Sequence, residues 1–308
     1  MDRFAQIEFF VAVADSGSLG RAASALGMSN AASSRLLASL ERRLGTRLVE
    51  RNTRRLYLTE EGQVFLPRAR AILDDLAEAE AALTETVLEP SGTLRVSASL
   101  SFALQHIAPR VPDYVRRYPK VRVHIEAANR YLDLIDNGID VAIRTREYEP
   151  DSNIIIRRLA ETRRILVAAP SYLEARGRPA HPRDLRRHDL LLYTYAKNPN
   201  ELAFSRGDES ARIEVHGLLE SNDGQILRAA AHNGLGIIVQ PAYIVYDDSR
   251  QGRLVPILDD WDLPRLAINI AYPSRKHLSA KVRSFIDFMV EHFAREDFER
   301  KWTGRFCS

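Results

Sequence analysis

Residues 18–45 read SLGRAASALGMSNAASSRLLASLERRLG, and this stretch decides the fold of the N-terminal part of the chain. Ser18 and Ser29 are of the residue type that caps the start of a helix, whereas Gly27 and Gly45 can adopt the left-handed backbone conformation that ends one. The pattern therefore predicts two short helices joined by a tight turn, which is a helix-turn-helix motif.

The second of these helices has one side suited to DNA. Ala32, Leu36, Leu40 and Leu44 recur every four residues and predict the side that packs on the rest of the domain. The other side is small or hydrogen-bonding near the helix start, which suits a major groove. A solvated surface helix is the alternative, although such helices more often carry Glu and Lys pairs. The residues predicted to contact DNA in this motif are Ser18, Arg21, Ser29, Asn30, Ala31, Ser33, Ser34 and Arg35.

A short hairpin is expected directly after the motif, with the segments 48–50 and 56–58 as its strands. Residues 35–55 contain seven Arg against two Glu, so this part of the chain is strongly basic. We expect arginines at the hairpin tip to neutralise phosphates or to enter the minor groove, and a solvated basic turn is the alternative. These arginines are Arg51, Arg54 and Arg55.

Thr59 can cap a long helix that would run to about residue 88. Apolar residues form a narrow stripe along it, which suits packing against a helix of a second subunit. Packing on the chain's own domain is the alternative. The predicted dimerisation residues are Phe65, Ile72, Leu76 and Leu83. The helix is followed by Glu89-Pro90-Ser91-Gly92, which predicts a domain boundary.

Alternating strand and helix patterns after residue 90 predict a parallel α/β sheet. In such sheets ligands bind at the carboxyl ends of the strands, where Ser99, Ser101, Asn129 and Arg144 would converge. Arg144 could clamp a carboxylate, but a salt bridge with a nearby acidic residue is the alternative. The neighbouring Leu100 and Phe102 favour an aromatic or aliphatic acid, although either could be a core residue.

Several motifs of the sequence resemble those of the LysR-type transcriptional regulators. They are Ser18-Leu19-Gly20-Arg21-Ala22-Ala23, Ser34-Arg35, Leu40-Glu41, Leu44-Gly45 and Leu58-Thr59. The resemblance implies an overall α/β protein with an N-terminal, mainly α winged helix-turn-helix domain (1–58), a long linker helix for dimerisation (59–89) and a two-lobed α/β effector domain (90–308) similar to periplasmic binding proteins. Lobe I would comprise about 91–163 and 265–308, and lobe II about 164–264.

The resemblance also implies an effector cleft between the two lobes. One wall would hold Ser99, Leu100, Ser101, Asn129 and Arg144, and the other Tyr195, Asn222 and Gln240. The implied partners are double-stranded operator DNA, a small-molecule effector, further copies of the chain in a homodimer or homotetramer, and RNA polymerase. The sequence does not specify the effector, the operator, the choice between activation and repression, or the choice between dimer and tetramer.

Length and composition argue against several other classes of protein. The chain has 308 residues, 45% hydrophobic residues, a net charge of +3 and one cysteine, Cys307. These values predict a cytoplasmic protein of two domains with no disulfide, and no apolar run suggests an export signal or a membrane partner. A free solute-binding protein or a small-molecule enzyme built on the two lobes is the alternative. We predict no enzyme, cofactor or metal, because catalytic motifs are lacking and the eight histidines are scattered.

Overall fold

The computed structural model describes residues 2–51, 56–82, 89–130, 132–147, 154–274 and 278–306. The chain divides into two compact units, one of residues 1–89 with 133–139 and the other of residues 90–132 with 140–308. Among the described residues, no helix combines the length and the apolar character that crossing a membrane requires.

The N-terminal unit is a three-helix bundle with a two-stranded hairpin and a long helix. The elements are α1 (Arg3–Ser16), α2 (Leu19–Ala25), α3 (Asn30–Leu44), β1 (Val49–Arg51), β2 (Leu56–Leu58) and α4 (Glu60–Ala82). Ser18 and Ser29 cap α2 and α3 through their side chains, and Gly45 ends α3 in the left-handed conformation. The predicted helix-turn-helix motif is therefore confirmed.

Aromatic and leucine side chains fill the core of this unit. Phe9, Phe10, Leu40 and Leu48 are buried to 1% exposure or less. Gly62 in the first turn of α4 lies against this core, because a Cβ atom there would come within 2.1 Å of the Leu48 carbonyl oxygen. Only a residue without a side chain lets α4 approach the segment before β1 so closely.

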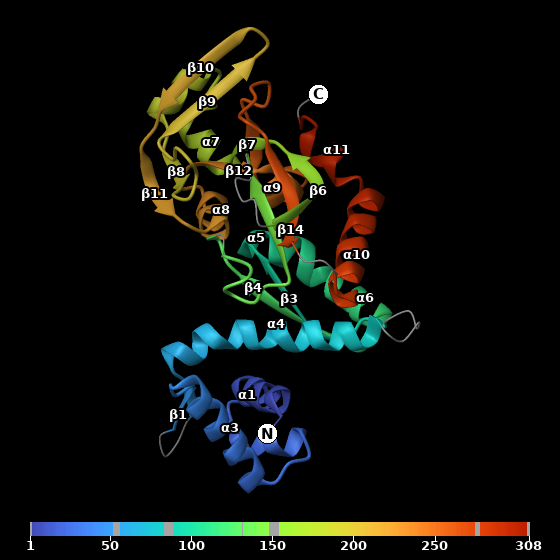
Figure 1. Ribbon diagram of the computed structural model, residues 1–308. Helices are drawn as coiled ribbons and strands as arrows, with labels where there is room; N and C mark the ends of the chain where they lie inside the picture. The colour runs from blue at the N-terminus through green and yellow to red at the C-terminus, as the bar shows by residue number, and fades with distance from the viewer. Residues whose placement is uncertain are drawn as a thin grey trace. The chain divides into compact units, whose positions relative to one another are not determined.

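The larger unit contains two five-stranded sheets, each the centre of one lobe (Figure 1). The sheet of lobe I has the order β4-β3-β5-β14-β6, with β3 parallel to β4 and β5, and with β14 antiparallel to β5 and β6. Its strands are β3 (Gly92–Ala98), β4 (Val121–Ala127), β5 (Val141–Arg146), β6 (Ile154–Thr162) and β14 (Leu266–Pro273). The sheet is thus mixed, not purely parallel as the alternation of strands and helices suggested.

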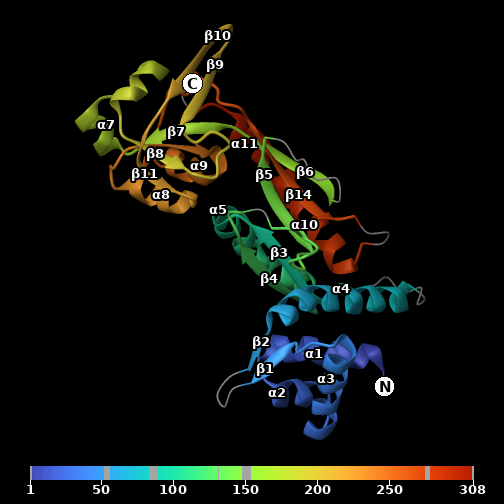
Figure 2. The same cartoon turned by 60° about the vertical axis from the view of Figure 1, so that its left-hand side comes forward.

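The sheet of lobe II has the order β11-β8-β12-β7-β13. Its strands are β7 (Arg164–Ala168), β8 (Leu190–Tyr193), β11 (Gly217–Ser221), β12 (Ile237–Pro241) and β13 (Val255–Ile257). A separate antiparallel hairpin, β9 (Glu201–Arg206) with β10 (Glu209–Glu214), extends from this lobe. The chain enters lobe II after β6 and returns with β14, and Figure 2 shows the two sheets as distinct bodies.

Helices cover both sheets of the larger unit. They are α5 (Leu100–Phe102), α6 (Val111–Arg117), α7 (Pro170–Arg176), α8 (Gly224–His232), α9 (Ala242–Arg250), α10 (Ala280–Glu296) and α11 (Phe298–Thr303). Between α5 and α6 the chain forms a π-helical turn (Ala103–Ile107) and a 3₁₀ turn (Ala108–Arg110). A further short helix, of the 3₁₀ type, covers Pro182–Arg187 in lobe II.

Candidate functional site

Helix α3 presents an exposed side that begins at its first turn. Asn30, Ala31, Ser34 and Arg35 are all exposed. The Arg35 Nε atom donates a hydrogen bond to the Ala31 carbonyl at 3.1 Å, which holds the guanidinium against this turn. The predicted combination of small side chains, an amide and a cation is therefore gathered on one accessible helix face.

Three other residues predicted to contact DNA have structural contacts at helix starts. The Ser18 hydroxyl accepts a hydrogen bond from the Arg21 amide at 3.4 Å, and the Ser29 hydroxyl accepts one from the Ala32 amide at 3.3 Å. The Arg21 guanidinium donates to the Ser16 carbonyl. These contacts position the two helices, and contact of the same residues with DNA stays a prediction.

The prediction for Ser33 is wrong. Its side chain is 1% exposed, and its hydroxyl donates to the Asn30 carbonyl at 2.9 Å. Ser33, Leu37 and Leu40 form the buried face of α3, so the helix is rotated by about one residue from the predicted packing side. A residue at this position packs against the domain and cannot contact a base.

The hairpin predicted after the motif is present, because β1 and β2 pair in antiparallel register from Val49 with Leu58 to Arg51 with Leu56. Arg54 and Arg55 lie outside the described residues, as does the side chain of Arg51. Their contacts with the DNA backbone stay a prediction.

The apolar stripe of α4 divides between two environments. Phe65 packs on Phe10 with 5.5 Å between ring centroids and belongs to the core of its own unit. The prediction that Phe65 faces a second subunit is therefore wrong. Ile72 is 41% exposed and Leu76 is half-buried, whereas Leu83 lies outside the described residues.

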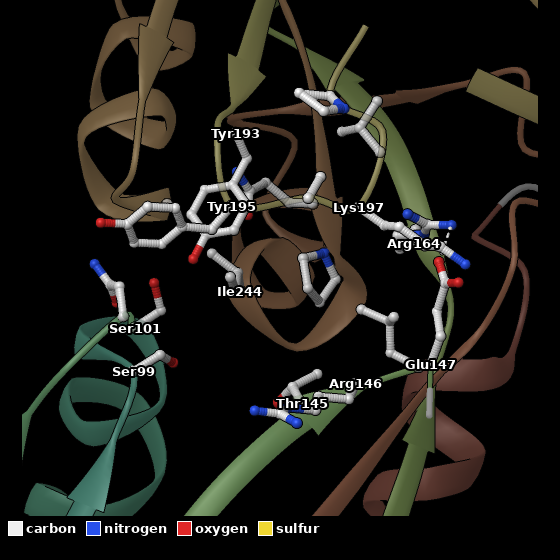
Figure 3. Close-up of a pocket in the computed structure, with 18 of the residues that line it drawn as sticks. Ser99, Ser101, Thr145, Arg146, Glu147, Arg164, Tyr193, Tyr195, Lys197 and Ile244 are labelled. Carbon is white, nitrogen blue, oxygen red and sulfur yellow. Dashed lines mark ion pairs between the residues drawn. The ribbon is translucent and has the colours of Figure 1, made fainter. Parts of the chain in front are cut away.

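A cavity of about 520 Å³ lies between the two lobes of the larger unit (Figure 3). Lobe I contributes the loops after β3 and β4 and the end of β5, and lobe II contributes β8 and the segment after it, β12 and the starts of α8 and α9. Five of the predicted effector-binding residues line it. They are Ser99, Ser101, Asn129, Tyr195 and Gln240. Loops from separate strands therefore converge on one cavity, as the sequence pattern predicted.

Two other predicted residues lie directly behind the lining. The Leu100 amide donates to the Asn129 side-chain oxygen at 3.2 Å, and the Asn222 amide nitrogen donates to the Tyr195 hydroxyl at 3.2 Å. The bond from Asn222, followed by the nearby Arg130 guanidinium, lowers the pKa of the Tyr195 phenol. Neither Leu100 nor Asn222 lines the cavity itself.

The prediction for Arg144 is wrong. Successive residues of a strand point to opposite faces, and in β5 the cavity is lined by Ile143 and Thr145 and, at the end of the strand, by Arg146, but not by Arg144. The Arg144 side chain is buried and donates to the Leu132 carbonyl at 3.2 Å. It therefore has a structural contact on the other face of the sheet.

Phe102 is also a core residue and not a ligand contact. Its side chain is 1% exposed, and its ring lies 5.5 Å from the Tyr243 ring and 5.0 Å from the His106 ring, measured between centroids. The alternative that this residue belongs to the core is the correct one.

Sequence reasoning missed the cations of the cavity. Arg146, Arg164 and Lys197 all line it. Arg164 forms an ion pair with Glu147 at 3.0 Å, and burial lowers the pKa of Arg164. Arg146 is the last residue of β5 and shares the face of Arg144 by strand alternation, so alternation does not predict that Arg146 lines the cavity. Arg164 and Lys197 come from lobe II, and nothing in their local sequence marks them as cavity residues.

Asn129 connects the two lobes at the cavity wall. Besides accepting from Leu100, it donates from Nδ2 to the Asp223 carboxylate at 2.6 Å. Asp223 caps α8 of lobe II by accepting from the Gln225 amide at 2.7 Å. A change in the separation of the lobes must therefore break or rebuild this contact.

Gln240 is the most informative polar group of the lining. Its side chain is 2% exposed, and its Nε2 atom has no hydrogen-bond partner in the parts of the chain that the structure describes. A Cβ atom on Gly224 would lie 3.1 Å from the Gln240 Oε1 atom and 3.3 Å from the Ser101 hydroxyl, so these groups meet at the start of α8. The cavity thus contains a buried hydrogen-bond donor to which a ligand can supply the acceptor.

A winged helix-turn-helix unit followed by two α/β lobes around a cavity defines a DNA-binding regulator with an effector-binding domain. Residues 4–63 match the family of bacterial regulatory helix-turn-helix proteins of the LysR family, and residues 88–294 match the LysR substrate binding domain. The chain belongs to the LysR-type transcriptional regulators, a family of regulators and not of enzymes.

Relatives cover the chain almost completely. The regulator PtxR of Pseudomonas aeruginosa is 34% identical over 94% of this chain and 92% of its own length. The structure of CrgA of Neisseria meningitidis is 32% identical, covers 95% of this chain and 99% of its own, and has a TM-score of 0.62. The full-length structure of the Vibrio cholerae virulence activator AphB is 28% identical, covers 94% of this chain and 99% of its own, and has a TM-score of 0.59.

Proposed function

We propose that this regulator responds to a small organic acid bound in the cavity between its lobes. The observation that carries the proposal is the buried Gln240 Nε2 donor, which lacks a partner within the described residues. An unsatisfied buried donor costs about 1–3 kcal/mol, so a ligand oxygen placed there gains that energy on binding. A carboxylate is the strongest small-molecule acceptor for such a group.

The surroundings of Gln240 favour an acid over a neutral ligand. The Ser99 and Ser101 hydroxyls line the same part of the cavity and can donate to a second carboxylate oxygen. Ile143, Leu191 and Val239 supply apolar surface for a hydrocarbon body. The cations elsewhere in the lining add a positive potential that favours an anion.

We further propose that the protein acts as an oligomer on operator DNA. Asn30 and Ser34 would contact base edges, Arg35 would contact phosphates, and the exposed part of α4 around Ile72 and Leu76 would pack against a second subunit. Recruitment of RNA polymerase stays a prediction of the family resemblance.

A ligand can shift the arrangement of the subunits on DNA only if it binds two conformational states of the protein with different affinities. The contact between Asn129 and Asp223 is one group that such a change would alter.

Calorimetric titration of the full-length protein with monocarboxylic acids, sugars and amines tests the effector class. We expect binding of acids only, and we expect Gln240→Leu to weaken it by about tenfold or more, because a hydrogen bond to a charged group is lost. Gln251→Leu on an exposed turn is the matched control and should bind normally. Both variants should keep operator affinity in a gel-shift assay. Binding of a neutral sugar alone would refute the proposal.

A further inference from the structure

The inter-lobe cavity has a second polar end, distinct from the part around Gln240. Figure 3 shows Ser99 and Ser101 on one side of the view and Lys197, Arg164 and Glu147 on the other, with Ile244 between them. The lining is therefore polar at both ends, and between them lie the apolar Ile244 and, on strand β5, Thr145 and Arg146. A ligand that fills it needs polar groups at both ends of an apolar body.

The described residues give the second end a positive charge. Arg164 is neutralised by its ion pair with Glu147 at 3.0 Å. The other acidic residue of the lining, Glu201, is paired at 3.5 Å with Arg212, which does not line the cavity. Lys197 has no ion pair or hydrogen bond with any residue that the structure describes. Within the part of the chain that the structure describes, the Lys197 ammonium is therefore left without a compensating charge.

The two ends differ in how they can hold an acidic group. The first end offers neutral donors, namely the Gln240 amide and the serine hydroxyls. The one acidic side chain there among the described residues is Asp223, which lies behind Asn129. The second end offers the Lys197 ammonium, a strongly hydrated point charge on a flexible stem. A monocarboxylate can satisfy only one of these ends at a time.

We propose that the effector is a dicarboxylic acid with an apolar middle, held by Gln240 and the serines at one end and by Lys197 at the other. This inference rests on the proposal that the cavity binds an organic acid, and it adds the class of acid and the residue that selects it. Lys197 is then a specificity-determining residue, because it distinguishes a second carboxylate from a methyl end. The body of the ligand lies along Ile244 and Ile143.

Titration calorimetry of the full-length protein with matched pairs of acids tests the inference. The pairs are succinate with butyrate, adipate with hexanoate, suberate with octanoate, and terephthalate with benzoate. We expect at least one diacid to bind about tenfold tighter than its monoacid, because a charge-assisted contact is added. Lys197→Met should remove this advantage and leave the affinity for the monoacid unchanged. Lys120→Met, at an exposed position of lobe I, is the matched control and should change neither affinity.

The outcomes separate the inference from the proposal on which it rests. Equal affinity for diacids and monoacids, with no effect of Lys197→Met, would overturn the inference while leaving an acid effector in place. Failure of both classes to bind, in protein that still binds operator DNA, would overturn the acid effector and the dicarboxylate together. A diacid preference that survives Lys197→Met would overturn the assignment of the second end to Lys197.

Discussion

At the scale of single residues, Asp248 on α9 shows how this fold tolerates a buried charge. Its side chain is 1% exposed and accepts from Arg228 at 2.9 Å, from Arg253 at 2.6 Å and from the His232 Nε2 atom at 3.1 Å. Burial alone would raise the pKa of this carboxyl, but the hydrogen bonds from Arg228 and Arg253 outweigh it and hold the pKa below its ordinary value. The carboxylate therefore ties α8, α9 and the following turn together.

We expect Asp248→Asn to lower the free energy of unfolding by about 1–3 kcal/mol, because partly exposed arginines lose a charged acceptor. Urea unfolding at neutral pH measures this difference. Since the folded-state pKa is depressed, the stabilisation is present above the unfolded pKa of about 3.9 and is lost as pH falls through the folded pKa. Wild type and variant should therefore converge in strong acid. Asp247→Asn, one residue away and exposed, should change little, and an equal loss in both variants would refute this role of Asp248.

Sequence reasoning predicted residue types well at this scale but missed their orientation. The pattern predicts an exposed Ser33 and an Arg144 that faces the cavity, but both side chains are buried. The neighbouring Ser34 is exposed instead, and the neighbouring Thr145 lines the cavity. One residue turns a side chain by about 100° in a helix and by 180° in a strand. Which residue faces outward depends on how the helix or strand packs on its neighbours, and the local sequence does not determine that packing.

At the scale of elements, helix-capping serines and helix-ending glycines made the helices of the DNA-binding unit predictable. Prolines explain why the helix predicted at the start of lobe I is interrupted. The helix pattern that follows the first strand of the effector domain predicts one continuous helix over about 101–117, but Pro109 and Pro112 each lack a backbone donor. The chain instead passes through a π turn and a 3₁₀ turn before α6. The hairpin of β9 and β10 was missed, although Gly207-Asp208 between two alternating segments is a hairpin signal.

The exposed face of α3 leads to a prediction about DNA binding. Arg35→Ala should weaken binding to all sequences alike and should reduce the salt dependence of affinity by about one unit of slope, because one phosphate contact is lost. Fluorescence anisotropy with operator and random duplexes over a salt series measures both effects. Arg43→Ala is the matched control, since Arg43 donates to Gln6 of α1 at 3.4 Å and faces the domain. Unchanged affinity and slope in Arg35→Ala would refute the proposed orientation of α3.

At the scale of the whole molecule, the order of parts was predictable because each part has its own sequence signature. The sequence predicts that the chain returns to lobe I at about residue 265, and β14 begins at Leu266 and lies between β5 and β6. The charged end of the cavity was not predictable. It joins Glu147 of lobe I with Arg164 and Lys197 of lobe II, and only the folded arrangement of both lobes brings them together.

Assembly is the remaining property of the whole molecule, and α4 allows a direct test. Ile72 is 41% exposed and Leu76 lies one turn further along the same stripe, so a second subunit can bury both. Leu76→Asp places a carboxylate in that interface and should convert an oligomer to a monomer at micromolar concentration in analytical ultracentrifugation. Operator affinity should fall steeply, because two linked DNA-binding units hold two half-sites together. Val64→Asp is the matched control, since Val64 is 63% exposed on the same helix but lies about 100° away from the stripe. A monomeric wild type, or a Leu76→Asp variant that assembles as Val64→Asp does, would refute this interface.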